Sequence, residues 1–179
     1  FTGFENLLSQ MYSDFDPDIK VTSKNQTFFS KSDFNFGELD SSQIDYALTI
    51  ENKVLAKYED KQFLTNLKGV SNNYENVTKI NGFVKEIFFE KNNSYNNVYL
   101  GLGLANNIGI QNESFNKTLS FFYPNFKTNT AFGVKPYNTD KAIVNKIFSF
   151  ASDVDNEFAI SEIEFAQNLF SKNGLISAI

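Results

Sequence analysis

Strand-length apolar segments separated by turn residues set the strongest limit on the fold of this chain. Glu59 and Asp60 divide two of these segments as a two-residue turn, which predicts a β-hairpin. Strands are expected at 46–57, 62–70, 83–90, 98–102, 119–123, 142–150 and 157–160. Short helical segments are expected at 72–80, at 104–108 with Gly109 as the cap, and from Ser161 until Asn173-Gly174 ends the helix. This alternation predicts an α+β (mixed α/β) fold with mainly antiparallel pairing.

The first sixteen residues are predicted to form an amphipathic helix. Pro17 ends it, because proline has no amide proton and disfavours the helical conformation of Asp16. The alternation in Ile19–Thr22 then predicts a strand. An ordinary core helix is the simplest interpretation of the apolar stripe. The side chains of that stripe are Phe1, Phe4, Leu7, Leu8, Met11 and Phe15.

The two ends of the sequence suggest a piece of a longer protein. The chain starts at Phe1 without an initiator methionine, and Leu175–Ile179 resembles the start of a strand. Hydrophobic residues make up 41% and charged residues 21%, which is typical of a globular domain. The sequence contains no apolar run of about 18 residues, the length that a membrane-spanning helix needs. We therefore expect any membrane anchor to lie outside these 179 residues.

The charge and the missing residue types exclude several kinds of function. The net charge is −5 and the lysines are scattered, which argues against a nucleic-acid partner. The chain has no cysteine, so it has neither disulfides nor thiolate chemistry. It also has no histidine, which removes the commonest general base and the usual zinc ligands. An enzyme here would have to use Asp, Glu, Lys and Tyr. The sequence shows no catalytic constellation of these residues, so we expect a non-catalytic domain without a cofactor or a metal.

Alternating acids after the first predicted helix resemble part of a calcium-binding loop. Asp14, Asp16 and Asp18 occupy the first, third and fifth positions of such a loop. The sixth position is Ile19 where the pattern needs glycine, and the twelfth is Asn25 where it needs a bidentate glutamate. Solvated carboxylates at a helix end are the better interpretation.

A Gly-Leu-Gly sequence lies between a predicted strand and a predicted helix. Gly101 and Gly103 have the position of glycines in a phosphate-binding loop. Asn106 stands where such a loop has its third glycine, and no Lys-Ser or Lys-Thr pair follows. A tight turn between strand and helix is the better interpretation.

Two pairs of acids are candidates for acid–base chemistry. Glu162 with Glu164 and Asp153 with Asp155 would each need to converge in a cleft. On turns and at helix starts, such residues are more often exposed to solvent or cap the helix.

Ser161, three residues before Glu164, has the spacing of a capping box and predicts a helix N-terminus there.

The segment from Asn125 to Asp140 is predicted to be a loop with more apolar bulk than solubility requires. Its large apolar side chains either fold back onto the core or contact a partner protein. They are Phe126, Phe132, Val134, Pro136 and Tyr137.

Several segments in chain order carry a resemblance to a known family. The segments are FTGFENLL, SDFDPDIKV, NKVLAKYEDKQFLTNLKGV, LGLGLANNIGI and SEIEFAQNLF. Together they resemble the extracytoplasmic domain of lipoprotein-releasing ABC transporter permeases of the LolC/LolE type. This type belongs to the MacB/FtsX superfamily, and the version here is similar to those of Bacteroidetes-like bacteria.

The resemblance implies a MacB-like periplasmic core domain of an inner-membrane protein. Residues 1–42 and 172–179 would form an incomplete membrane-proximal, porter-like part with a strand and a helix. Residues 43–171 would form the inserted, mostly antiparallel distal (Sabre-like) subdomain. The first helix would continue a transmembrane helix, with Phe1, Phe4, Leu8 and Met11 marking where the domain leaves the membrane.

The implied function is to relay ATP-driven motion and to hand lipoproteins from the inner membrane to a soluble carrier. The implied partners are a cytoplasmic ATPase subunit, a second permease subunit, a periplasmic lipoprotein carrier and the lipoprotein cargo. In LolC-like members a hairpin that follows a strand ending in proline docks the carrier. The flanks Tyr123-Pro124 and Ala142 match, which assigns docking to the segment between them. Its candidate contacts are Phe126, Phe132, Pro136 and Tyr137.

Other functions stay open on the sequence. A MacB-type efflux permease or an FtsX-type regulatory permease would have a partner that is not a lipoprotein carrier. A stand-alone binding domain and a carboxylate-dependent hydrolase belong to different classes. The hydrolase would need two acids in one pocket, with the pKa of one of them raised.

Overall fold

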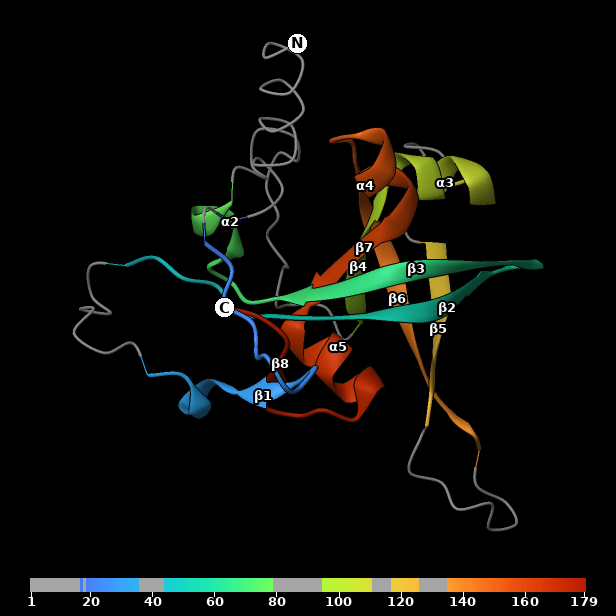
Figure 1. Cartoon of the computed structure of the whole chain (residues 1–179). Helices are drawn as coiled ribbons and strands as arrows, with labels where there is room; N and C mark the ends of the chain where they lie inside the picture. The colour runs from blue at the N-terminus through green and yellow to red at the C-terminus, as the bar shows by residue number, and fades with distance from the viewer. Residues whose placement is uncertain (1–16, 18, 36–43, 79–94, 111–116, 126–134) are drawn as a thin grey trace.

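The computed structural model of this chain describes residues 17, 19–35, 44–78, 95–110, 117–125 and 135–179 (Figure 1). Several predicted features lie outside these residues: the first helix with Phe1, Phe4, Leu8 and Met11, the acids Asp14, Asp16 and Asp18, the strand at 83–90, and Phe126 and Phe132. Within the described part, no helix is long and apolar enough to cross a membrane.

The centre of the described structure is a closed β-barrel. Its strands follow one another in the order β2-β3-β7-β4-β6-β5, and β5 pairs with β2 to close it. The β3–β7 and β4–β6 pairs are parallel, and the other pairs are antiparallel. The strands are β2 (Thr49–Tyr58), β3 (Lys61–Val70), β4 (Asn96–Gly101), β5 (Lys117–Pro124), β6 (Tyr137–Phe148) and β7 (Phe158–Glu162). The predicted α+β fold with mainly antiparallel pairing is confirmed.

The β2–β3 hairpin has the predicted turn. Tyr58 pairs with Lys61 across Glu59 and Asp60, and Glu59 has the positive φ of 52° that such a tight turn requires. Along β2 the side chains alternate between two faces, as a strand demands. Val54 and Ala56 are buried in the barrel core, whereas Lys53 on the opposite face is exposed.

Helix α5 (Ile163–Phe170) supplies much of the core that fills the barrel. Its Phe165 packs edge-to-face on Phe121 of β5, with ring centroids 5.7 Å apart. The ring centroids of Phe170 and Tyr123 lie 4.7 Å apart. Each such ring contributes about 1.5–3 kcal/mol through burial. Figure 1 shows α5 against one end of the barrel, with α3 and α4 at the other end.

The start of α5 differs from the prediction. Ser161 is a fully buried residue of β7, and its hydroxyl donates to the carbonyl of Glu162. Glu162 is the N-cap and makes no side-chain capping hydrogen bond. The capping-box prediction was wrong because β7 runs directly into the helix, so Ser161 pairs with Gly69 and Val98 in the sheet. The helix also ends earlier than the predicted Asn173-Gly174, at Ser171 with φ 53°.

Short helices cover a second apolar cluster on the other side of the sheet. Tyr99, Phe148 and Ile160 from the strands pack there with Tyr74 and Val154. The helices are α2 (Tyr74–Val77) and α4 (Ser152–Glu157), whereas α3 (Leu102–Ile108) packs Ala105 and Ile108 into the main core. The predicted cap of α3 at Gly109 is confirmed by its φ of 81°. Helix α4 was not predicted.

Strand β6 is longer than the sequence indicated. It begins at Tyr137, so Tyr137 to Asp140 belong to a strand that was predicted as loop. The reason is the partner strand, because β5 pairs with β6 as far as Pro124↔Tyr137. The two strands continue beyond the barrel as a protruding hairpin (Figure 1).

The two terminal segments pair with each other and with the barrel. Strand β1 (Phe29–Ser30), followed by the short helix η1 (Lys31–Asp33), pairs antiparallel with β8 (Leu175–Ile176). Val21 and Ile179 exchange two backbone hydrogen bonds of 2.8 and 3.0 Å. Residues 19–22 do not form the predicted strand. Their strand-like pairing is limited to the two hydrogen bonds between Val21 and Ile179. Ala178 bridges to Thr49 of β2.

Candidate functional site

The outward side chains of four neighbouring strands form one surface at the root of the β5–β6 hairpin. Strand register places Leu55 of β2 opposite Leu64 of β3 on one side and Phe122 of β5 on the other. Phe122 in turn lies opposite Thr139 of β6. An apolar row therefore crosses the outside of the barrel, on the face opposite the one that α5 covers.

This surface is hollowed into a groove of about 590 Å³, which we call the hairpin-base groove. Leu64 is 67% exposed, and Tyr137 is 39% exposed. Tyr137 packs edge-to-face on Phe122, with centroids 5.5 Å apart. The groove residues are Lys53, Val54, Leu55, Lys57, Gln62, Leu64, Phe122, Tyr123, Pro124, Pro136 and Tyr137.

The charges at the groove are positive, in contrast to the chain as a whole. Lys53 and Lys57 line it on either side of Leu55, and none of its lining residues is acidic. The whole chain carries a net charge of −5. Glu51 follows on the same strand face beyond Lys53, outside the lining residues. The groove thus combines exposed apolar side chains with a locally basic rim, which suits an apolar partner surface bearing carboxylates.

Hydrogen bonds hold the base of the hairpin in place beneath the groove. The amide of Asn125 donates to the carbonyl of Pro136 at 2.8 Å and closes the β5–β6 ladder. Asn138 donates to the carbonyl of Leu169 on α5 at 2.9 Å. On the inner face, the Tyr123 hydroxyl accepts from the Asn52 side chain at 3.0 Å. Burial raises the pKa of Tyr123, and the bond from Asn52 acts in the opposite direction.

The structure brings two of the predicted contact residues together, Pro136 and Tyr137, both in the groove. Sequence reasoning missed Leu64 and Phe122. A signal for both was present, because each belongs to a pair of consecutive apolar residues in a strand, Phe63-Leu64 and Phe121-Phe122. Successive strand residues point to opposite faces, so one member of each pair must lie outside.

The Gly-Leu-Gly sequence has a packing explanation. A Cβ atom at Gly101 would overlap the backbone carbonyl of Asp155, and one at Gly103 would overlap the side chain of Asn156. The two glycines therefore allow α4 to approach the start of α3. This agrees with the turn interpretation and accounts for both glycines without a phosphate.

The two acid pairs lie away from the groove. Asp155 is buried and accepts from the Ser149 hydroxyl at 2.8 Å and from the Phe150 amide at 2.7 Å, which ties α4 to the end of β6. Asp153 is exposed on the same helix. Glu162 and Glu164 lie at the start of α5. Among the described residues, no group of three or more acids is placed to hold a metal ion.

Comparison with known proteins identifies the fold. No family model and no curated protein matches the sequence. Among solved structures, the chain is similar to the extracellular domain of the noncanonic ABC-type transporter YknZ from Gram-positive bacteria. The TM-score is 0.54 at 14% sequence identity, over 87% of this chain and 74% of that one. At this identity the similarity shows a shared fold, and function has to be argued separately.

Proposed function

We propose that this chain is a non-catalytic extracytoplasmic domain of an ABC transporter permease, exposed to the periplasm. The observation that carries the proposal is the fold shared with the extracellular domain of YknZ across 87% of the chain. The partners that follow from it are a cytoplasmic ATPase subunit and a second permease subunit. The domain itself uses no cofactor in this proposal. Its part is to transmit motion and to bind another protein.

The hairpin-base groove is the proposed docking surface, and the partner is a soluble lipoprotein carrier that receives lipoprotein cargo. Protein interfaces favour exposed aromatic and aliphatic anchors surrounded by polar residues. Leu64 and Tyr137 are such anchors, and the lysine rim favours a carrier surface with carboxylates. In this proposal Phe126 and Phe132 of the hairpin add to the anchoring by Pro136 and Tyr137.

The terminal segments are the proposed route by which motion reaches the barrel. Residues 1–42 and 172–179 form the membrane-proximal part in this proposal, and residues 43–171 form the distal part. The pairing of Val21 with Ile179 and of β1 with β8 supports it, because the two segments are held side by side. Thr49 hydrogen-bonds to Ala178 in both directions and connects them to β2. The helix predicted from the sequence at Phe1, Phe4, Leu8 and Met11 is the proposed link to the membrane.

A MacB-type efflux permease is the second candidate. The similarity to the extracellular domain of YknZ, a noncanonic ABC-type transporter, fits this candidate as well as the first. The full-length reading frame tests the permease class, which requires one hydrophobic span before Phe1 and three after Ile179. A gene for a lipoprotein carrier next to this reading frame would favour lipoprotein release over efflux.

A pull-down with the purified carrier tests the docking surface. Leu64→Ser and Tyr137→Ser remove exposed apolar anchors, and we expect each to weaken carrier binding by roughly tenfold or more. Tyr95→Ser is the matched control, since Tyr95 is 67% exposed, like Leu64, but lies outside the groove. All three variants should keep the wild-type unfolding midpoint. Undiminished carrier retention by Leu64→Ser and Tyr137→Ser would exclude the groove as the docking surface.

The lysine rim allows a second, electrostatic test. Changing Lys53 and Lys57 together to glutamate reverses the charge of the rim without touching its apolar floor. We expect slower association with the carrier and a weaker dependence of the association rate on salt concentration. An unchanged salt dependence would show that the partner does not meet this rim with carboxylates.

A further inference from the structure

A tight turn with an Asn-Gly sequence joins the end of α5 to β8. The amide of Leu175 donates to the carbonyl of Lys172 at 2.9 Å, so Asn173 and Gly174 are the two central residues of the turn. Gly174 has φ 74°, whereas Asn173 is not among the residues with positive φ, an arrangement typical of a type II turn. Both residues are exposed, so solvent reaches this turn.

The two groups of this pair that can react with each other are not held apart. Asparagine is a chemically labile residue, because the backbone nitrogen of the next residue can attack its side-chain carbonyl carbon, Cγ. At Gly174 no Cβ shields that nitrogen, and nothing lies within 4 Å of the place that a Cβ would take. Within the described part of the chain, neither the Asn173 side chain nor the Gly174 amide makes a hydrogen bond. No hydrogen bond therefore has to break before the two groups meet.

The hydrogen bonds around the turn leave its central peptide free to rotate. The bond from Leu175 to Lys172 closes the turn, and the Gln167 side chain donates to the carbonyl of Leu175 at 2.8 Å just after it. Rotation of the central peptide changes one turn type into another without breaking the closing bond. The nitrogen of Gly174 can therefore turn toward Cγ of Asn173 while the surrounding fold stays intact.

We propose that Asn173 is a site of spontaneous deamidation. The amide nitrogen of Gly174 gives its proton to hydroxide or a buffer base and forms a bond to Cγ of Asn173. The Cγ–Nδ2 bond breaks, ammonia leaves, and a cyclic succinimide remains. Water opens the ring at either carbonyl: release of Cγ gives aspartate, and release of the backbone carbonyl carbon gives isoaspartate. The net reaction takes up one water and loses one ammonia, and it does not depend on the function proposed for the domain.

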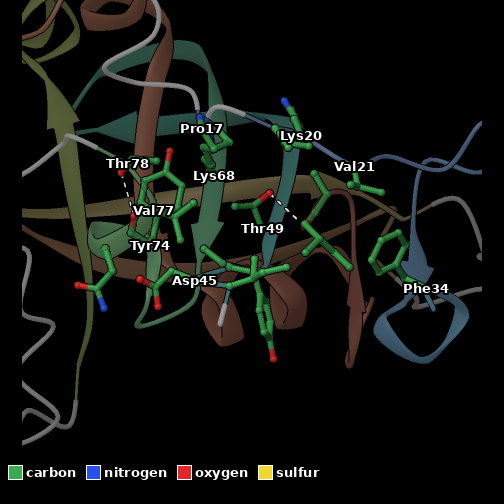
Figure 2. Close-up of a pocket in the computed structure, with 17 residues that line it drawn as sticks. Pro17, Lys20, Val21, Phe34, Asp45, Thr49, Lys68, Tyr74, Val77 and Thr78 are labelled. Atoms are coloured by element: carbon green, nitrogen blue, oxygen red, sulfur yellow. Dashed lines mark hydrogen bonds between the residues drawn. The ribbon is translucent and has the colours of Figure 1, made fainter. Parts of the chain in front are cut away.

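The isoaspartate product changes the connection to β8. Its main chain passes through Cβ and Cγ, which adds one backbone atom to the turn. Directly after the turn, β8 pairs with β1. Beyond β8, Ala178 accepts from the Thr49 amide, and Ile179 pairs with Val21. These four residues line a cavity of about 400 Å³ between the terminal segments and the barrel (Figure 2). Lengthening the turn therefore disturbs the pairing that holds the two terminal segments together.

Peptide mapping by mass spectrometry, after incubation of the folded chain at neutral pH, tests the proposal. A synthetic peptide of residues 169–179 gives the rate without the fold. We expect Asn173 in the folded chain to react within roughly tenfold of the peptide's rate, since the turn leaves the reacting groups free. Asn168 is the internal control, because it is exposed as well but lies inside α5 before Leu169. It should react more slowly than Asn173 by roughly tenfold or more.

Two variants separate the chemistry from its structural effect. Asn173→Gln keeps an amide on a longer side chain, so ring closure is slower and the mass change at this site should disappear. Incubated in the same way, it also controls for changes elsewhere, including the Asn-Gly pair at 81–82, which lies outside the described residues. Asn173→Asp carries the charge of the products without the extra backbone atom. Because that charge is exposed, its urea midpoint should match the wild type.

Incubated wild-type protein, with its isoaspartate content measured from fragment spectra, should unfold at a lower urea concentration than either variant. The deamidation proposal is overturned if Asn173 in the folded chain reacts more than roughly tenfold more slowly than in the peptide, or if Asn168 reacts as fast. Incubated wild-type protein that contains isoaspartate and is as stable as Asn173→Asp would overturn the effect on β8.

Discussion

Replacing Gly101 with alanine tests whether the Gly-Leu-Gly segment exists for packing. Gly101 has φ −61° and ψ 145°, a conformation open to any residue, so the substitution adds no backbone strain. The added Cβ would instead overlap the carbonyl oxygen, carbonyl carbon and Cα of Asp155. The obstacle is backbone, which cannot rotate away as a side chain does.

The size of the effect follows from opposing contributions. Without a clash, alanine would stabilise the fold by about 0.4–1 kcal/mol, because it restricts the unfolded chain more than glycine does. Overpacking a filled site costs about 1–3 kcal/mol. Asp155 is held by hydrogen bonds to Ser149, Phe150 and Ala151, so α4 resists moving aside. Because α4 resists moving aside, the overpacking cost lies toward the upper end of its range, and after the gain is subtracted we expect Gly101→Ala to lose about 2 kcal/mol.

Urea denaturation measures this loss as a lower midpoint at an unchanged slope. Gly174→Ala is the control, because Gly174 has φ 74° and nothing within 4 Å of its added Cβ. It separates the cost of a positive φ, about 1–2 kcal/mol, from a steric clash. A Gly101→Ala protein as stable as the wild type would refute the packing explanation and return the phosphate-loop interpretation to consideration.

Other substitutions test the core, a buried carboxylate and a buried phenol. Phe165→Ala should cost about 3–5 kcal/mol in urea denaturation, and a loss under about 1 kcal/mol would contradict its core position. Asp155→Ala deprives the Phe150 amide of its acceptor and should cost about 1–3 kcal/mol, with exposed Asp153→Ala near neutral; equal losses would contradict this. Because burial raises the pKa of Tyr123, its stabilisation is complete below about pH 10 and is lost as pH rises through the raised pKa of the folded state. Tyr123→Phe should weaken the alkaline loss of stability, and unchanged pH profiles would contradict it.

The β2–β3 hairpin and the cap of α3 were predictable because they depend on neighbours in sequence. Glu59 and Asp60 make a two-residue turn between strands that pair directly, and Gly109 adopts the left-handed conformation that ends a helix. Ser161 shows the limit of such local signals. Its spacing to Glu164 fits a capping box, yet its pairing with Gly69 and Val98, both distant in sequence, keeps it in β7.

The candidate site was likewise predictable only in part from the sequence. Apolar bulk at Pro136 and Tyr137 was visible in the sequence, and both residues lie in the hairpin-base groove. The pairs Phe63-Leu64 and Phe121-Phe122 show that one residue of each pair faces outward. The sequence does not show that these residues are Leu64 and Phe122. Alternation states that one residue of each pair faces out, but not which one.

The sequence by itself determined the α+β character, the turn at Glu59-Asp60 and an apolar segment at the β5–β6 hairpin. Only the tertiary structure decided which face of the sheet is the core, because that depends on where α5 packs. Phe165 and Phe170 cover the side of β5 that carries Phe121 and Tyr123, and this leaves Phe122 outside. Closure of the barrel through β2 and β5 then places Leu55 beside Phe122. The packing of α5 on β5 and the pairing of β2 with β5 both join residues far apart in the sequence, so no local sequence pattern encodes them.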